Sequence, residues 1–103
     1  GEKILPWQVE QAAYTYPGVI AAIVCGIPSK LHGEDVCLCL QIDPRHFSAE
    51  QLPGHLRKLL PNYACPRYIL YWEEFPMNAS GKTDLKRIKA EAYSRVKSND
   101  VTS

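Results

Sequence analysis

The sequence lacks a long apolar run: no stretch approaches the roughly 20 consecutive apolar residues that span a bilayer. The first residues also lack the apolar stretch of a secretion signal. Strong charge of either sign is absent, because 12 basic and 11 acidic residues give a formal net charge of +1. A chain without a strong positive field does not recruit nucleic acid or an anionic membrane. We therefore expect a soluble cytoplasmic protein that binds phosphate only locally.

The cysteines also lack a metal-binding pattern, since the chain has no C-x-x-C pair and no histidines close to its cysteines. Cys37 and Cys39 alternate with aliphatic residues, as small apolar residues on one strand face do. We expect free structural thiols in a reducing compartment and no bound metal. The residues in question are Cys25, Cys37, Cys39 and Cys65, with the scattered histidines His32, His46 and His55 expected at the surface.

What the sequence does contain is the composition of one small globular domain. It has 103 residues and a mass of 11.6 kDa, with 46% hydrophobic and 22% charged residues. A chain of this size has room for one modest core and for no separate substrate domain. Trp7 and Trp72 are expected to anchor the packing of that core; the alternative is that either lies partly exposed at an interface with a domain outside this chain.

The apolar spacing predicts the elements of an α+β fold. A helical stripe over residues 6–16 ends at a Pro-Gly pair, and short β-branched runs over 19–25 and 35–42 predict two antiparallel strands. Residues 48–51 have the form of a capping box before a leucine-rich helix that ends at residue 60. Pro53 makes the start of that helix irregular or moves it closer to the proline.

Residues 67–73 predict a third strand, and residues 85–96 predict a last amphipathic helix. The expected order is helix, strand, strand, helix, strand, helix, with a small three-stranded sheet covered by about three helices. Residues 1–96 form the expected domain, and residues 97–103 form a polar tail that we expect to fray.

The segment from Pro76 to Asp84 carries the most informative chemistry. It reads P-M-N-A-S-G-K-T-D and places Lys82 on a flexible Gly/Ser loop before a helix that Thr83 or Asp84 caps. An ammonium in that position can enter a site and neutralise a phosphate and a carboxylate together. The segment is no phosphate-cradling P-loop, because that motif needs glycine where Pro76 stands.

Ordered segments along the chain resemble the C-terminal lid domain of the adenylate-forming acyl-CoA synthetases. The similarity extends over residues 1–96, and its segments are Gly1-Glu2-Lys3-Ile4, Val9-Glu10, Pro17-Gly18-Val19, Gly26-Ile27-Pro28, Gly33-Glu34, Leu60-Pro61-Asn62-Tyr63, Pro66-Arg67 and Pro76-Met77-Asn78-Ala79-Ser80-Gly81-Lys82. The resemblance implies a ligase that forms an acyl-adenylate and pyrophosphate from a carboxylic acid and ATP. A thiol, that of coenzyme A, then displaces AMP to give a thioester.

The resemblance also implies roles for particular residues. Lys82 matches the lysine that serves adenylation, and Gly1, Glu2 and Lys3 match the loop that approaches the pantetheine thiol arm. Tyr63 and Arg67 match positions that touch the nucleotide end of coenzyme A in some relatives. Two departures from the family pattern are Cys65, where some members carry a basic residue, and Leu85, where a basic residue often follows the aspartate.

ATP, magnesium and the acid are held, by this resemblance, in a large N-terminal domain that is the partner of the lid. The isolated chain is therefore expected to be inactive. Two alternatives stay open: an adenylation domain that loads a carrier protein, and a stand-alone non-catalytic binding module of the same fold.

Overall fold

The computed structural model describes residues 5–31 and 33–102. The elements are, in chain order, α1 (Pro6–Tyr14), β1 (Val19–Ser29), β2 (Gly33–Ile42), α2 (Leu52–Leu59), a 3₁₀ turn η1 (Asn62–Ala64), β3 (Tyr68–Trp72) and α3 (Leu85–Thr102). The predicted α+β class and its order of three helices and three strands are confirmed.

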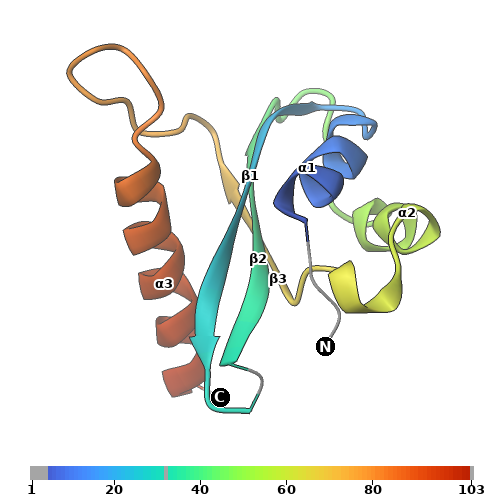
Figure 1. The fold of residues 1–103 in the computed structure, drawn as a ribbon. Coiled ribbons are helices and arrows are strands. Elements are labelled where there is room, and N and C mark those ends of the chain that lie inside the picture. The colour runs from blue at the N-terminus through green and yellow to red at the C-terminus, as the bar shows by residue number, and fades with distance from the viewer. Residues whose placement is uncertain (1–4, 32, 103) are drawn as a thin grey trace.

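The three strands form one mixed sheet in the order β1-β2-β3. β1 and β2 pair antiparallel across a short turn, as predicted, whereas β2 and β3 are parallel. A parallel pair needs a crossover connection, and α2 with η1 supplies it. Figure 1 shows α1 and α2 on one face of the sheet and α3 on the other.

Each face of the sheet carries its own apolar cluster, and the central strand β2 contributes to both. Leu38 and Leu40 pack toward α1 and α2, while Cys37 and Cys39 pack toward α3. All four side chains are fully buried. The alternation follows from the pleat of a strand, in which successive side chains point to opposite faces.

β1 is an edge strand, and α1 supplies hydrogen-bond partners along its outer side. The amide of Ala22 donates to the Tyr14 hydroxyl at 3.0 Å, and the amide of Val24 donates to Glu10 Oε2 at 3.0 Å. β1 also runs through Gly26 to Ser29, beyond the predicted end at residue 25. The predicted strand ended before Gly26-Ile27-Pro28, but proline is tolerated in an edge strand.

The second helix starts later than the predicted capping box. Its N-cap is Gln51, which makes no side-chain capping bond, and Pro53 lies in the first turn, where proline is tolerated. The predicted capping box is wrong, because the helix begins at Leu52 and Ser48 lies before its N-cap. The Ser48 carbonyl accepts a hydrogen bond from the Tyr16 hydroxyl at 2.5 Å. α3 continues to Thr102, through most of the predicted polar tail. No helix in the described part of the chain is long and apolar enough to cross a membrane.

Candidate functional site

Residues 76–84, which carry Lys82, form a surface hairpin closed by backbone hydrogen bonds. The flexibility expected of this loop stays a prediction. The Asp84 amide donates to the Pro76 carbonyl at 2.8 Å, and the Asn78 amide donates to the Lys82 carbonyl at 2.7 Å. The Gly81 amide closes a turn onto the Asn78 carbonyl at 3.0 Å. Gly81 has a φ of 81°, which places a left-handed residue after the turn, as in a hairpin loop with a G1 bulge.

Lys82 lies at the exposed end of this hairpin. Its side chain is solvent-exposed, and it has no ion pair among the residues that the structure describes. Asp84 follows as the N-cap of α3, because its Oδ1 accepts the Arg87 amide at 3.1 Å. The ammonium is therefore carried on an ordered backbone and is available to an anionic group outside this domain.

Tyr63 lies in η1, and Arg67 lies on the connection from η1 to β3. Tyr63 is 45% exposed, so a ring face remains open to a ligand. The Arg67 guanidinium is already engaged: its Nε lies 3.5 Å from Asp35 Oδ2 and 3.2 Å from the Tyr68 hydroxyl. Arg67 also lies over the Tyr68 ring, 5.6 Å from the centroid. Binding a phosphate through Arg67 would thus compete with the Asp35 carboxylate.

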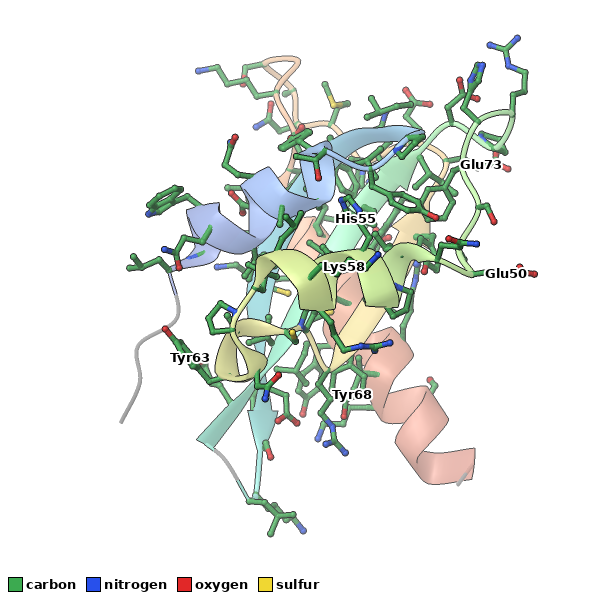
Figure 2. All side chains as sticks on the ribbon, turned by 90° about the vertical axis from the view of Figure 1, so that its right-hand side faces the viewer. Glu50, His55, Lys58, Tyr63, Tyr68 and Glu73 are labelled. Atoms are coloured by element: carbon green, nitrogen blue, oxygen red, sulfur yellow. The ribbon has the colours of Figure 1, made fainter. Side chains whose placement is uncertain are left out.

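The two predicted groups of site residues are not brought together in this structure. In Figure 1 the hairpin after β3, drawn in orange, rises at the upper end of the molecule, whereas η1 and the start of the described chain lie below. Figure 2 shows Tyr63 and Tyr68 at the lower part from the side, far from that hairpin. The predicted thiol-arm residues Gly1, Glu2 and Lys3 lie outside the described residues. The described site residues therefore occupy two opposite ends of one domain.

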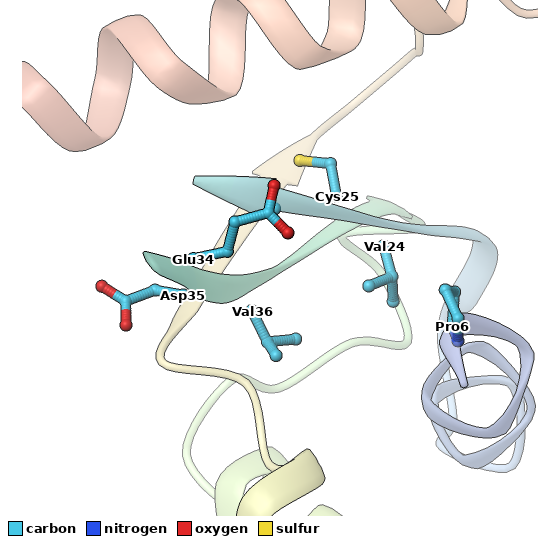
Figure 3. Close-up of a pocket in the computed structure, with 7 residues that line it drawn as sticks. Pro6, Val24, Cys25, Glu34, Asp35 and Val36 are labelled. Atoms are coloured by element: carbon cyan, nitrogen blue, oxygen red, sulfur yellow. The ribbon is translucent and has the colours of Figure 1, made fainter. Parts of the chain in front are cut away.

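A pocket of about 160 Å³ lies where α1 begins, against the paired ends of β1 and β2. Figure 3 shows Pro6 and Val24 on one side of it and the carboxylates of Glu34 and Asp35 on the other. Two carboxylates at its wall repel phosphate groups. This pocket is consequently unsuited to the nucleotide end of a phosphorylated ligand.

Three thiols form a compact cluster under α3. Cys25 Sγ and Cys37 Sγ each lie 4.0 Å from Cys39 Sγ, and the three sulfurs lie within 4.8 Å of one another. Hydrogen bonds from Cys37 and Cys39 lower the pKa of Cys25. The hydrogen bond with Cys25 raises the pKa of Cys37 to about 12 and raises the pKa of Cys39 as well. Without a metal, ionisation of one thiol thus opposes ionisation of the others. The three sulfurs are close enough together to ligate one metal ion, so the expectation of metal-free thiols stays a prediction.

All four cysteines are free, and Cys65 is the half-buried one. The sequence did not predict the cluster, because Cys25 is distant along the chain from the other two. The strand register, which pairs Cys25 with Cys37, brings them together.

The two tryptophans differ in burial. Trp72 anchors the core as predicted and is 6% exposed, whereas Trp7 is 59% exposed, which matches the alternative of partial exposure. α3 holds Trp72 from outside: the Arg95 guanidinium lies 3.9 Å above the ring, and the indole Nε1 donates to Glu91 Oε1 at 2.9 Å. Glu91 and Arg95 are four residues apart, so they lie on one face of the helix. This spacing in the sequence is consistent with the joint contact of both side chains with Trp72.

The histidines are likewise not uniform. His46 is exposed as predicted, while His55 is half-buried, with its ring 5.3 Å from that of Tyr16 and its Nε2 2.7 Å from the Thr15 hydroxyl. His55 therefore contributes to packing between α1 and α2 while it remains partly exposed. His32 lies outside the described residues.

Known proteins resemble this chain in sequence over most of its length. The mitochondrial medium-chain acyl-CoA ligase of Danio rerio is 29% identical over 90 residues, which cover 86% of this chain and 15% of that protein. A putative acyl-CoA synthetase of Bacillus subtilis is 28% identical over 90 residues, with 86% and 16% covered. The chain thus spans about one sixth of the length of these curated relatives.

Solved structures share its fold as well. The crystal structure of a Brucella canis acyl-CoA synthetase matches with a TM-score of 0.75 at 33% identity, over 92% of this chain and 18% of that one. A Mycobacterium tuberculosis fatty acyl-CoA synthetase matches with a TM-score of 0.79 at 24% identity, over 92% and 19%. The family model for the AMP-binding enzyme C-terminal domain matches residues 8–82. Because that match covers most of the 103 residues and ends on the hairpin lysine, the chain belongs to the AMP-binding enzyme C-terminal domain family.

Proposed function

We propose that this chain is the lid domain of an ATP-dependent acid-thiol ligase of the acyl-CoA synthetase type. The observation that carries the proposal is Lys82, an exposed lysine without an ion pair among the described residues, at the end of an ordered hairpin. The relatives named as acyl-CoA ligases support the reaction class. The lid works with a large N-terminal domain outside this chain, which binds ATP, magnesium and the carboxylic acid.

In the first half-reaction a carboxylate oxygen attacks the α-phosphorus of ATP, and the bond to pyrophosphate breaks. Both reactants are anions, so their approach is opposed by charge repulsion. Lys82 lowers this barrier by placing one positive charge between the carboxylate and the phosphate oxygens. Its role is electrostatic and positional, and it transfers no proton.

In the second half-reaction the thiol of coenzyme A attacks the acyl carbon, and AMP leaves. We assign the thiol arm to the loop of Gly1, Glu2 and Lys3, and the nucleotide end of coenzyme A to Tyr63 and Arg67. The distance between the two ends of the domain favours a rotation of the whole lid between the half-reactions. The two ends would then enter one active site in turn.

Two other acceptors or roles are distinguishable by assay. A carrier-protein pantetheine uses the same thiol chemistry, and its acceptance in place of coenzyme A would identify a carrier-loading domain. A stand-alone module would leave acid activation unchanged when Lys82 is replaced.

We propose a cytoplasmic location, which imaging of the tagged full-length protein tests against the mitochondrial location in the name of the Danio rerio relative.

The deciding experiment compares both half-reactions in the full-length enzyme. Lys82→Ala should slow acid-dependent ATP–pyrophosphate exchange by orders of magnitude, because it removes a charge contact of the transition state. It should leave thioester formation from a preformed acyl-adenylate near normal. Gly1→Leu should do the reverse, because a large side chain blocks the thiol arm.

Lys30→Ala is the matched control, because Lys30 is an exposed lysine in the turn between β1 and β2. Lys30→Ala should change the rate of neither half-reaction. The 103-residue chain alone should show no acid-dependent ATP–pyrophosphate exchange. Equal impairment of both half-reactions by Lys82→Ala and by Gly1→Leu would contradict the proposal.

A further inference from the structure

Asn78 is the centre of the hairpin that carries Lys82. Its side-chain Oδ1 accepts from the Ser80 amide at 3.0 Å, from the Ser80 hydroxyl at 2.8 Å and from the Lys82 amide at 3.1 Å. Since the two amide groups can only donate, the atom that faces them must be the amide oxygen and not the nitrogen. One side-chain atom therefore accepts three hydrogen bonds from two residues of the turn, Ser80 and Lys82.

Asn78 also binds the other side of Lys82. Its backbone amide donates to the Lys82 carbonyl at 2.7 Å, so both peptide groups of the lysine are hydrogen-bonded to this one residue. Such bonds leave Lys82 its side-chain torsions but restrain its backbone. A lysine on a freely moving loop would instead have to be ordered each time it entered a site.

The base of the hairpin is fixed to the body of the domain. Phe75, which precedes the hairpin, is 2% exposed in the cluster under α3, and its amide donates to Gln41 Oε1 at 2.9 Å. At the other end, Asp84 bonds the Pro76 carbonyl and caps α3. The hairpin is thus connected to the sheet on one side and to the last helix on the other.

We propose that Asn78 is a positioning residue that fixes Lys82 as a rigid extension of the domain for adenylation. This inference rests on the function proposed above for Lys82. Asn78 touches no reacting atom: it acts only through the backbone of Lys82. Displacement of a catalytic group by about 1 Å can lower a rate about 100-fold, so the loss of these bonds has a measurable effect.

The first test measures backbone order by amide hydrogen exchange in the 103-residue chain. Asn78→Ala should raise the exchange rates of the Ser80 and Lys82 amides by roughly 3- to 10-fold, because each loses its acceptor. Amides of β2 and α3 should keep their rates. Asn78→Asp, which retains the acceptor oxygen, should restore slow exchange, and Asn62→Ala, in the exposed η1, should change neither amide.

The second test measures acid-dependent pyrophosphate exchange in the full-length enzyme. Asn78→Ala should lower kcat about 10- to 100-fold and should leave the KM values for ATP and acid within about twofold. In a Lys82→Ala background, Asn78→Ala should lower the remaining kcat by less than about twofold, because no lysine remains to be positioned. A merely structural role would instead impair both backgrounds equally.

The outcomes separate this inference from the proposed function. If Lys82→Ala leaves pyrophosphate exchange intact, the proposed function fails, and the positioning role fails with it even where the amide exchange behaves as expected. If Lys82→Ala abolishes activity while Asn78→Ala changes neither kcat nor the Lys82 amide, only the positioning role is overturned. Unequal losses in the two backgrounds, together with faster Lys82 amide exchange, support it.

Discussion

Replacing Gly18 by alanine tests how tightly the turn between α1 and β1 is packed. Gly18 has a φ of 86°, and a Cβ at this position would lie 2.7 Å from the backbone nitrogen, Cα and Cβ of Phe47. Phe47 has little freedom to move, because its ring packs against those of Tyr16 and Tyr71 at 5.7 and 5.3 Å. The Gly18 carbonyl also accepts the Asp43 amide at 2.9 Å. The substitution therefore combines backbone strain with a clash.

The two contributions have separate magnitudes. A left-handed backbone costs an L-residue roughly 1–2 kcal/mol, and alanine returns about 0.4–1 kcal/mol by restricting the unfolded chain. Forcing atoms into a packed site costs about 1–3 kcal/mol more. We expect Gly18→Ala to lower the free energy of unfolding by about 3 kcal/mol. For a chain of this size each kcal/mol lowers the Tm by roughly 4–8 °C.

Gly33→Ala is the matched control, because Gly33 has a φ of 79° and no atom within 4 Å of its missing Cβ. It carries the strain without the clash, so it should cost only about 1 kcal/mol. The assay is urea unfolding of the 103-residue chain, followed by fluorescence of the buried Trp72 and by far-UV circular dichroism. Coincident transitions justify a two-state analysis.

The difference between the unfolding free energies of Gly18→Ala and Gly33→Ala isolates the contact with Phe47. The backbone strain and the effect of alanine on the unfolded chain are common to both variants and cancel. If Gly18→Ala is no more destabilising than Gly33→Ala, the packing of Gly18 against Phe47 does not constrain the fold and the reasoning is refuted.

Three further changes have defined outcomes. Asp84→Ala removes the α3 cap from the Arg87 amide and should lower the free energy of unfolding by about 1 kcal/mol in urea titration, whereas Asp84→Asn should retain most of it. In the folded chain a thiol reagent should label Cys65 first and the three buried thiols only after unfolding, with no zinc in elemental analysis; early labelling of all four would contradict this. The hydrogen bond with His46 lowers the pKa of Asp43, so its stabilisation is present above the ordinary value near 4 and is lost as the pH falls through the lowered value. Asp43→Asn should therefore flatten the pH dependence of chemical unfolding below about pH 4, and an unchanged acid limb would refute this.

The sequence predicts most of the fold because apolar spacing reports directly on burial. The alternation around Cys37 and Cys39 located β2. Of the four leucines predicted for the apolar face of α2, those at 52, 56 and 60 are buried, whereas Leu59 is 52% exposed. The predicted boundaries of two elements were wrong, because a residue that often ends or begins an element does not do so here. Ser48, expected as a helix cap, lies before the N-cap because the helix starts at Leu52, and Pro28 continues a strand because that strand lies at the edge of the sheet.

The candidate site was predicted in part. The motif identifies Lys82, but the hairpin around it was not foreseen, although Asn78 and Gly81 stand where a turn favours asparagine first and glycine fourth. The pairing of Arg67 with Asp35 was beyond sequence reasoning, because the two residues meet only through the parallel register of β2 and β3. Contacts of this kind depend on tertiary structure rather than on local pattern.

The cover of β1 by α1 has a consequence for how the chain behaves in concentrated solution. An open strand edge is a template on which a second chain can add a strand, and such edges are a common origin of aggregation. Here the outward amides of Ala22 and Val24 already donate to Tyr14 and Glu10. Pro28, at the same parity along the strand, has no amide hydrogen to offer. A neighbouring molecule that approaches β1 therefore finds the amides of Ala22 and Val24 already engaged, which disfavours edge-to-edge growth of the sheet on this side.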